Sequence, residues 1–259
     1  MDLLSVQERL FQLPSLGRGY EDVPFIAGDS VKLRPIVTGH QRDLAKAGSD
    51  PYRVYFTMLN TFVVEPKMAW DELLMGDVNA IMFAVRLMTY GKDYPIEYTC
   101  EECGAKQKVD VDLTVVPKKT ADDVDDFQTE GLELMLNGCG SKITMHLGRL
   151  KDEKVVSGQM RTMEKADRVK QVDVDRALLS LAQLIDSIDG NTKMVLPEKF
   201  EFVLNLDGYD MNQVNDFIMA SRIGLMPVPG IICKRCSWEN EEVLQFNAAF
   251  FRAPRRVTA

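Results

Sequence analysis

Two Cys-x-x-Cys pairs, far apart in the chain, limit what this sequence can fold into. The first stands in YTCEECGAK at Cys100 and Cys103, and the second in GIICKRCSWEN at Cys233 and Cys236. Strand-like segments flank both pairs, which predicts two β-hairpins with two thiols at each tip. A tetrahedral zinc ion takes four such ligands, so one pair leaves two positions empty. We therefore expect the hairpins to meet in one split zinc ribbon, although 129 residues (104–232) separate the pairs.

The cysteine pairs also admit other interpretations. A redox-active pair of the thioredoxin type precedes a helix within a βαβ unit, and no helical pattern follows either pair. A catalytic zinc needs an open coordination position, which four thiolates do not leave. Nucleic-acid binding by the second tip could use Lys234, Arg235 and Trp238, but glutamates adjoin the tips at 101–102 and 241–242. A structural zinc bound by all four cysteines is therefore the prediction.

The charge of the chain is acidic, with 31 basic against 39 acidic residues, a net charge of -8 and a pI of about 5.0. Such a surface repels the phosphates of nucleic acids and anionic membranes, so neither is an expected partner. No run of 18 apolar residues predicts a transmembrane helix. The start MDLLSVQERLFQ lacks the basic and apolar regions of a secretory signal, so we expect a reducing compartment and no disulfides.

Hydrophobic periodicity predicts an α+β fold, with a mainly helical core and two CxxC β-hairpins joined into the split ribbon. A chain of 259 residues, 46% of them hydrophobic, can bury a sizeable core. We expect the following regions: an extended N-terminal arm and edge strand (1–37), a helical region (38–92), the two ribbon hairpins (93–116 and 228–252), and a mixed region of a hairpin and helices that packs on the helical core (117–227).

Caps and breaks place several elements within these regions. A short helix is expected at the start of the chain, and VKLRPI at 31–36 has the proline of an edge strand. Asp50 and Pro51 predict the first residues of a helix. An amphipathic helix is expected over 174–188, and a later helix is expected to be capped by Asp210.

Other candidate chemistry is sparse. The two histidines, His40 and His146, are expected to have solvated or hydrogen-bonded structural roles, and Cys139 is expected to be a small buried residue. The acidic run ADDVDD at 121–126 lacks the spacing of an EF-hand loop and is expected to be solvated. Because no Gly-rich phosphate loop or nucleophile elbow is present, the sequence predicts neither an enzyme nor a small-molecule substrate.

Several segments together resemble the baseplate hub and hub-assembly proteins of T-even-like contractile-tailed (myovirus) bacteriophages. That family has a Pro-Ser-x-Gly-x-x-Tyr start, an Arg-Pro strand, a helix that ends in Arg-x-x-x-x-Gly-x-x-Tyr, two CxxC pairs and a Phe-Phe tail. The matching positions are Pro14, Ser15, Gly17, Tyr20, Arg34, Pro35, Arg86, Gly91, Tyr94, Cys100, Cys103, Gly104, Cys233, Cys236, Phe250 and Phe251. The resemblance is loose over 117–195, and Ser237 stands where a glycine is usual after the second pair.

The resemblance implies a non-enzymatic structural or assembly component of a tail baseplate, located in the virion and assembled in the host cytoplasm. Its expected partners are other baseplate and tail proteins. The residues expected to contact them are those of the arm and the tail: Pro14, Ser15, Gly17, Tyr20, Phe250 and Phe251. The Phe pair has an alternative, which is to fold back on the chain's own C-terminal hairpin. The alternative function is a zinc-ribbon regulator that binds nucleic acid, which the acidic pI disfavours. A metalloenzyme is the third hypothesis.

Overall fold

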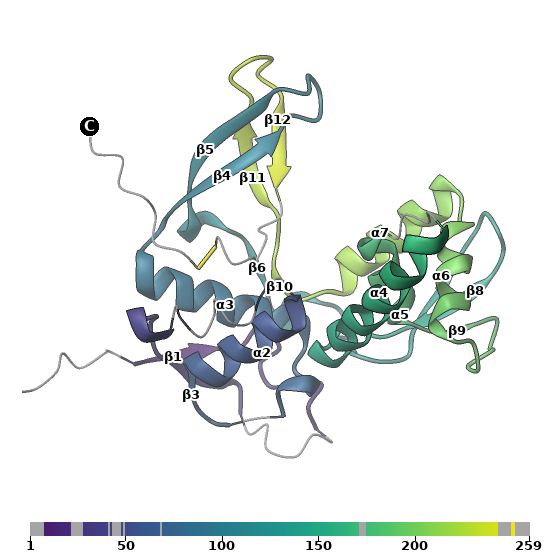
Figure 1. Cartoon of the computed structure of the whole chain (residues 1–259), viewed down its shortest axis with the longest axis horizontal. Coiled ribbons are helices and arrows are strands. Elements are labelled where there is room, and N and C mark those ends of the chain that lie inside the picture. The colour runs from purple at the N-terminus through teal and green to yellow at the C-terminus, as the bar shows by residue number, and fades with distance from the viewer. Residues whose placement is uncertain are drawn as a thin grey trace, which may run out of the picture.

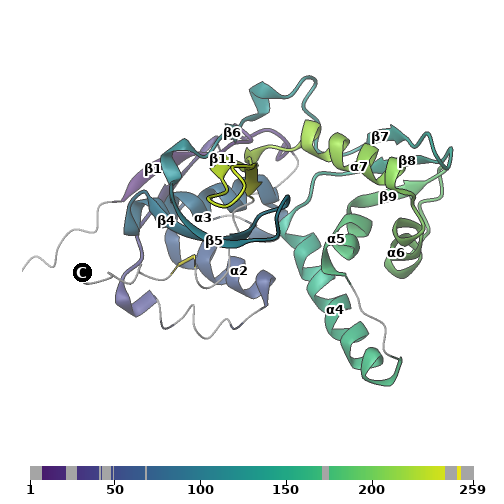
Figure 2. The ribbon, with the colours of Figure 1, turned by 90° about the horizontal axis from the view of Figure 1, so that it is seen from above.

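The computed structural model describes residues 8–21, 28–40, 42, 48, 50–67, 69–170, 175–242 and 250–251. Within them, helices and strands are mixed, so the predicted α+β class is confirmed. Buried apolar side chains form two separate clusters, and each cluster is the core of one lobe. Figures 1 and 2 show the two lobes side by side, and Figure 1 shows two hairpins that project from the first lobe. Parts of the predicted arm, of the helical region that begins at 38 and of the second hairpin fall outside the described residues.

Among the described residues, the first lobe combines the helices Pro51–Phe62 and Met75–Tyr90 with a small antiparallel sheet. Its strands pair in the order β1-β2-β3. The bounds are β1 Arg9–Gln12, β2 Ser30–Leu33, β3 Val63–Glu65, α2 Pro51–Phe62 and α3 Met75–Tyr90, with a 3-10 turn at Trp70–Glu72. Helix α2 begins as predicted, because the Asp50 side chain accepts a hydrogen bond from the Arg53 amide and Pro51 is the first helical residue.

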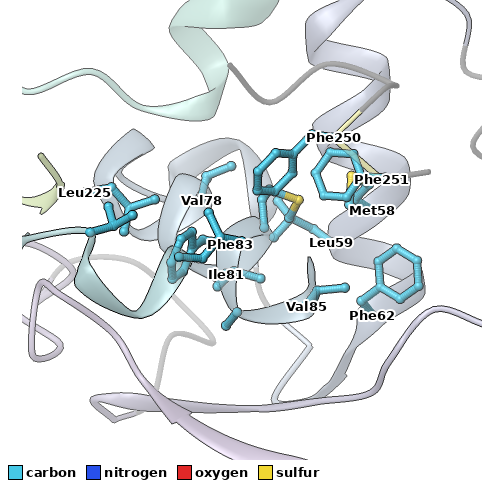
Figure 3. Close-up of a cluster of buried hydrophobic side chains, with 14 of the residues drawn as sticks. Met58, Leu59, Phe62, Val78, Ile81, Phe83, Val85, Leu225, Phe250 and Phe251 are labelled. Atoms are coloured by element: carbon cyan, nitrogen blue, oxygen red, sulfur yellow. The ribbon is translucent and has the colours of Figure 1, made fainter. Parts of the chain in front are cut away.

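Helix α3 lies at the centre of this lobe and is buried on several sides. Its buried residues run almost without a break, and two of them are charged, Asp77 and Arg86. A helix that is apolar around most of its circumference needs neighbours on all those sides. Figure 3 shows part of this cluster, in which Ile81, Phe83 and Val85 of α3 meet side chains from other elements.

Two hairpins project from the first lobe (Figure 1). Strands β4 (Asp93–Thr99) and β5 (Lys106–Asp112) form the first, and β11 (Val228–Ile232) and β12 (Glu239–Glu242) form the second. Both pairs are antiparallel, and the second has an irregular register between Val228 and Ile231. The predicted hairpins are therefore present among the described residues, each as a two-stranded sheet.

The second lobe is formed by one continuous part of the chain. Four helices surround a sheet whose strands pair in the order β7-β8-β9. The bounds are β7 Leu132–Met135, β8 Lys142–Met145, α4 Leu150–Lys170, α5 Arg176–Leu184, β9 Ile185–Ile188, α6 Leu196–Leu204 and α7 Gly208–Ser221. In Figure 2, α4 extends beyond the rest of this lobe. No helix within the described ranges is both long and apolar enough to cross a membrane.

The backbones of the two lobes are in close contact where the lobes meet. The Met75 amide donates to the Gly148 carbonyl at 2.8 Å, and the Leu150 amide donates to the Leu73 carbonyl at 2.9 Å. After α7 the chain returns to the first lobe through β10 (Gly224–Leu225), which pairs with β6 (Lys118–Lys119). At this crossing the two backbones nearly touch, since a Cβ on Gly224 would come within 2.8 Å of the Gly76 carbonyl oxygen.

Three predictions about elements are wrong. The segment 31–36 is not an edge, because β2 lies between β1 and β3 in its sheet. Residues 9–12, within the predicted short helix, form β1. The helix predicted over 174–188 ends at Leu184, and the last four residues form β9. Two isoleucines in those four residues favour a strand, and pairing with β8 satisfies their backbone groups.

The predicted cap of α7 is also wrong, for an instructive reason. Asp207 caps the helix, and its side chain accepts from the Asp210 amide at 2.8 Å. The Asp210 carboxylate instead accepts the amides of Gly138 and Cys139, each at 2.7 Å, and is buried. It therefore fixes the β7–β8 turn to α7. The side chain of Cys139 is exposed rather than buried, because it lies on this turn.

Candidate metal centre

The four paired cysteines meet between the two hairpin tips. Their sulfur atoms all lie within 4.8 Å of one another. Cys100 Sγ is 3.6 Å from Cys236 Sγ, and Cys103 Sγ is 3.7 Å from Cys233 Sγ. Four thiolates that surround a zinc ion as a tetrahedron, with bonds of about 2.3 Å, are about 3.8 Å apart. The sulfur spacing therefore fits a single tetrahedral ion, and the residues present can hold one.

The two tips have the same local geometry. In the first, the Cys100 amide donates to Ala105 and the Gly104 amide donates to Cys100; in the second, Cys233 and Ser237 make the equivalent bonds. The residue after the second cysteine has a positive φ in both tips, 67° at Gly104 and 61° at Ser237. A glycine takes this conformation freely, whereas a serine is strained in it. A serine instead of the usual glycine at position 237 therefore increases the backbone strain of the turn, while the turn keeps the same shape.

Backbone amides and neighbouring sulfurs shift the pKa values of these thiols. Burial raises the pKa of Cys233, but the amides of Cys236 and Arg235 more than offset this and lower it to about 6. The Cys103 amide lowers the pKa of Cys100. The Trp238 amide lowers the pKa of Cys236, yet burial and the adjacent sulfurs raise it to about 12. Sulfur atoms this close repel one another when ionised, and a bound cation would offset that repulsion.

Two amide side chains, which the sequence reasoning missed, hold the hairpins together around the cysteines. Gln107 on β5 donates to Cys233 Sγ at 2.7 Å and accepts from the Lys234 amide at 3.0 Å. Asn240 on β12 accepts from the Glu101 amide at 3.1 Å and is 3% exposed. Asparagine is uncommon in strands, so its presence at position 240, close to a cysteine pair, was the one sequence signal that could have indicated this structural role.

The N-terminal arm folds into the first lobe. Its motif residues Pro14, Ser15 and Tyr20 are buried, and Gly17 is half-buried. The Ser15 amide donates to Asp77 Oδ1 at 2.9 Å, and the Tyr20 hydroxyl donates to Asp77 Oδ2 at 2.5 Å. Burial raises the pKa of Asp77. The arm is therefore attached to the first turn of α3 through one fully buried carboxylate.

Arg149 ties the same arm to the second lobe. Its guanidinium donates to the Gly19 carbonyl at 2.9 Å and to the Glu72 carbonyl at 2.7 Å, and it lies 5.8 Å from the centre of the Tyr20 ring. Arg149 is 5% exposed. The sequence offered no signal for this role, because an arginine at the start of a polar helix is ordinarily solvated.

The Phe pair is also internal. Phe250 and Phe251 are 0% and 3% exposed, and both belong to the core of the first lobe. Phe250 packs edge-on against Tyr94 at 4.9 Å and lies 5.8 Å from the Arg86 guanidinium. Figure 3 shows both rings in the cluster that contains Met58 of α2. The rings thus pack against α2, α3 and β4 within the first lobe.

Three separate motif segments therefore converge on one cluster. Arg86, Tyr94 and Phe250 come from a helix, a hairpin and the tail, and their rings and guanidinium stack. Tyr90 adds a hydrogen bond from its hydroxyl to the Phe251 carbonyl at 3.0 Å. Contact of the arm and the tail with other proteins stays a prediction. Because most motif residues of the arm are buried, a partner protein could contact the arm only on the exposed side of the turn around Gly17.

The histidine expected to have a structural role lies between two carboxylates in the second lobe. His146 Nδ1 is 2.7 Å from Asp186, and its Nε2 is 3.3 Å from Asp152. Burial lowers the pKa of His146, but the two carboxylates more than offset it and raise it to about 9. Asp152 is held in turn by the Arg149 amide at 2.7 Å. This ion pair connects β8, β9 and α4.

The chain was compared with protein families, curated proteins and solved structures. The family model described as T4 bacteriophage base plate protein matches residues 10–252. That range includes the arm, both hairpins and the Phe pair. No curated protein and no solved structure matches the chain.

Proposed function

Because the chain belongs to the family of T4 bacteriophage base plate proteins, we propose that it is a non-enzymatic structural or assembly component of the hub of a contractile-tail baseplate. The observation that carries the proposal is the family match over nearly the whole chain. The contacts of the motif residues support a structural role. Ser15 and Tyr20 donate hydrogen bonds to the distant Asp77, and Arg86 contacts the distant Phe250.

The position in the hub can be tested on phage particles. The experiment is a cryo-electron microscopy reconstruction of baseplates from the phage that encodes this chain, with mass spectrometry of hub assembly intermediates. We expect the chain to be found at the centre of the baseplate or in the hub intermediates. Its presence only at the periphery, or in neither sample, would contradict a hub role and leave the family membership intact. Loss of this chain should halt tail assembly before a complete baseplate forms.

The second element of the proposal is one structural Zn²⁺ per chain, bound by Cys100, Cys103, Cys233 and Cys236. Support comes from the sulfur spacing, which fits a tetrahedral ion. Zinc would contribute directly to folding here, since it joins two hairpins that share no strand pairing among the described residues.

Elemental analysis of the purified protein tests the zinc. We expect about one zinc per chain in the wild type and in Cys139→Ser, whose cysteine lies on a distant turn. Cys233→Ser should lose the metal. A wild-type protein without zinc, or one that binds iron when purified from cells, would rule out this part of the proposal.

The proposed partners are other baseplate and tail proteins. Family membership supports these partners, and it also supports a location in the virion. The nucleic-acid-binding alternative is not taken further, because neither the acidic charge of the chain nor its family favours it.

A further inference from the structure

A cavity of about 150 Å³ lies at the junction of the two lobes, away from the cysteine cluster. Helix α3 contributes one wall, β7 and β8 another, and the end of α7 a third. The wall residues used below are Met75, Asn79, Leu132, Met145, Phe217 and Ile218. Because both lobes line it, a group bound there would contact both and hold them in one relative position.

The size of the cavity fits one six-membered ring. An engineered protein cavity of about 150 Å³ with apolar walls stays dry and binds benzene. The walls here are also mainly apolar, with two methionines whose flexible side chains adapt to an inserted group. When the cavity is empty, the side chains that line it lack the van der Waals contacts that a bound group would supply.

One polar atom on the wall has no partner. Asn79 Oδ1 is buried and accepts no hydrogen bond from any described residue. The two ionisable side chains of the wall have partners: His146 lies between its two carboxylates, and Arg222 donates to the Leu225 carbonyl at 2.8 Å. A buried acceptor without a donor destabilises the folded chain, so a ligand that supplies a donor to Asn79 regains that free energy.

We propose that this cavity binds a phenol ring whose hydroxyl group hydrogen-bonds Asn79. The amide of Asn79 can accept from a hydroxyl in one orientation and donate to it in the other, so either orientation serves. The occupant is the tyrosine side chain of a neighbouring protein, because base plate proteins assemble with other proteins. That identity rests on the proposed function, whereas the ring chemistry rests only on the cavity.

The ring chemistry is tested by titration of zinc-loaded, full-length protein that carries ¹³C-labelled methionine methyl groups. Phenol should shift the methyl signals of Met75 and Met145, and it should bind several-fold more tightly than benzene. In Asn79→Leu, which keeps the volume and removes the acceptor, phenol and benzene should bind alike. No shift of the two methyl signals, or equal binding of the two compounds to the wild type, would overturn the proposal.

A matched pair of variants on β7 separates cavity binding from surface binding. Leu132→Trp places a large side chain at the cavity wall, whereas Met135→Trp places it at an exposed position on the same strand. We expect the first to abolish phenol binding and the second to leave it unchanged. If Leu132→Trp does not fold, Asn79→Leu alone still decides the outcome. Phenol binding that persists in a folded Leu132→Trp variant contradicts the site.

A third measurement identifies the source of the ring. N-acetyl-L-tyrosinamide, which mimics a tyrosine side chain on a peptide, should displace phenol from the wild type. If free phenol binds and this compound does not, the tyrosine occupant is refuted, and the site takes a small free phenol instead. Failure of the hub experiment with success here would leave the ring site intact, so the two proposals fail separately.

Discussion

The two lobes form their hydrophobic cores in different ways. The second lobe is continuous, from Leu132 to Ser221, and its core side chains come from neighbouring elements of the chain. The first lobe brings together the arm, the central helices, both hairpins and the Phe pair, which are separated by up to 240 residues of sequence. Closing such long loops costs more conformational entropy than local packing does. The first lobe therefore needs attachments that the second does not.

Those attachments are polar, and among the described residues they are concentrated in the first lobe. Asp77 holds the arm, Arg86 stacks with the tail, and Gln107 and Asn240 join the two hairpins. In the second lobe the comparable groups, His146 and Asp210, lie at the ends of strands and helices. Buried polar groups restrict which partners a segment can have, so they specify long-range assembly where hydrophobic contact alone does not.

Removal of the metal should have the largest effect and should separate the two lobes. Structural zinc in small domains contributes about 10–16 kcal/mol, which is comparable to the stability of a whole domain. We expect Cys233→Ser, or chelation, to abolish hydrogen-exchange protection of β4, β5, β11 and β12, while α5 and α6 keep theirs. Hydrogen exchange with mass spectrometry measures this, with Cys139→Ser as the control. Equal loss of protection in α5 and α6 would show that the lobes are one cooperative unit.

Phe250→Ala should have the second largest effect, again confined to the first lobe. Phe250 is fully buried, and truncation of a buried phenylalanine costs about 3–5 kcal/mol. Arg86 and Tyr94 would also lose their contact with the ring. Thermal or urea unfolding gives the free energy. The control is Phe56→Ala, since Phe56 is 37% exposed, and it should cost less than about 1.5 kcal/mol. A similar loss in both variants would contradict the internal role of the tail.

How far the sequence predicted this structure differs between its parts. The meeting of Cys100, Cys103, Cys233 and Cys236 could be anticipated, because a metal site needs four ligands and each pair supplies two. The start of α2 at Pro51 was equally accessible, since the cap and the proline act within one turn. Both predictions depend on chemistry that is local or that has a fixed stoichiometry.

The rest depended on tertiary contacts that no local pattern shows. Residues 185–188 continue an amphipathic helical pattern, and only pairing with β8 makes them a strand. By its sequence position Asp210 could be a helix cap, but in the structure its carboxylate accepts hydrogen bonds from the amides of the β7–β8 turn. The attachment of the arm to the first lobe could not be predicted, because nothing in its sequence reveals that Asp77 is buried beneath it.

The ion pairs of His146 in the second lobe should make the free energy of unfolding depend on pH. The folded pKa of His146 is raised to about 9 from its usual 6.5, so its ion pairs stabilise the fold fully below pH 6.5. That contribution, about 3 kcal/mol, should be lost as the pH rises from 6.5 through 9. Urea unfolding of the metal-loaded wild type and of His146→Gln at several pH values measures it. A wild-type curve parallel to that of the variant over this range would contradict the assignment.

Gln107→Ala should weaken the metal site more than it weakens the fold. The substitution removes the donor to Cys233 Sγ and the acceptor for the Lys234 amide, which cross from one hairpin to the other. Outer groups of this kind change metal affinity by about 10-fold to 100-fold, so we expect at least a tenfold loss, or about 1.4 kcal/mol. Competition with a zinc chelator measures it. Lys108→Ala, at an exposed position next to it, is the control and should leave the affinity unchanged.

The smallest expected effect compares the two tips with each other. Ser237 has a φ of 61° where the first tip has Gly104 at 67°, and a side chain in this conformation costs about 1–2 kcal/mol. Ser237→Gly should therefore stabilise the second hairpin, but glycine also increases the entropy of the unfolded chain, so the net gain should be about 0.5–1 kcal/mol. Gly104→Ser is the matched reverse change and should destabilise the first hairpin by a similar amount. Urea unfolding of the zinc-loaded variants measures both. If the two changes had the same sign, the tips would differ in more than the strain of one residue, and their equivalence around the metal would have to be abandoned.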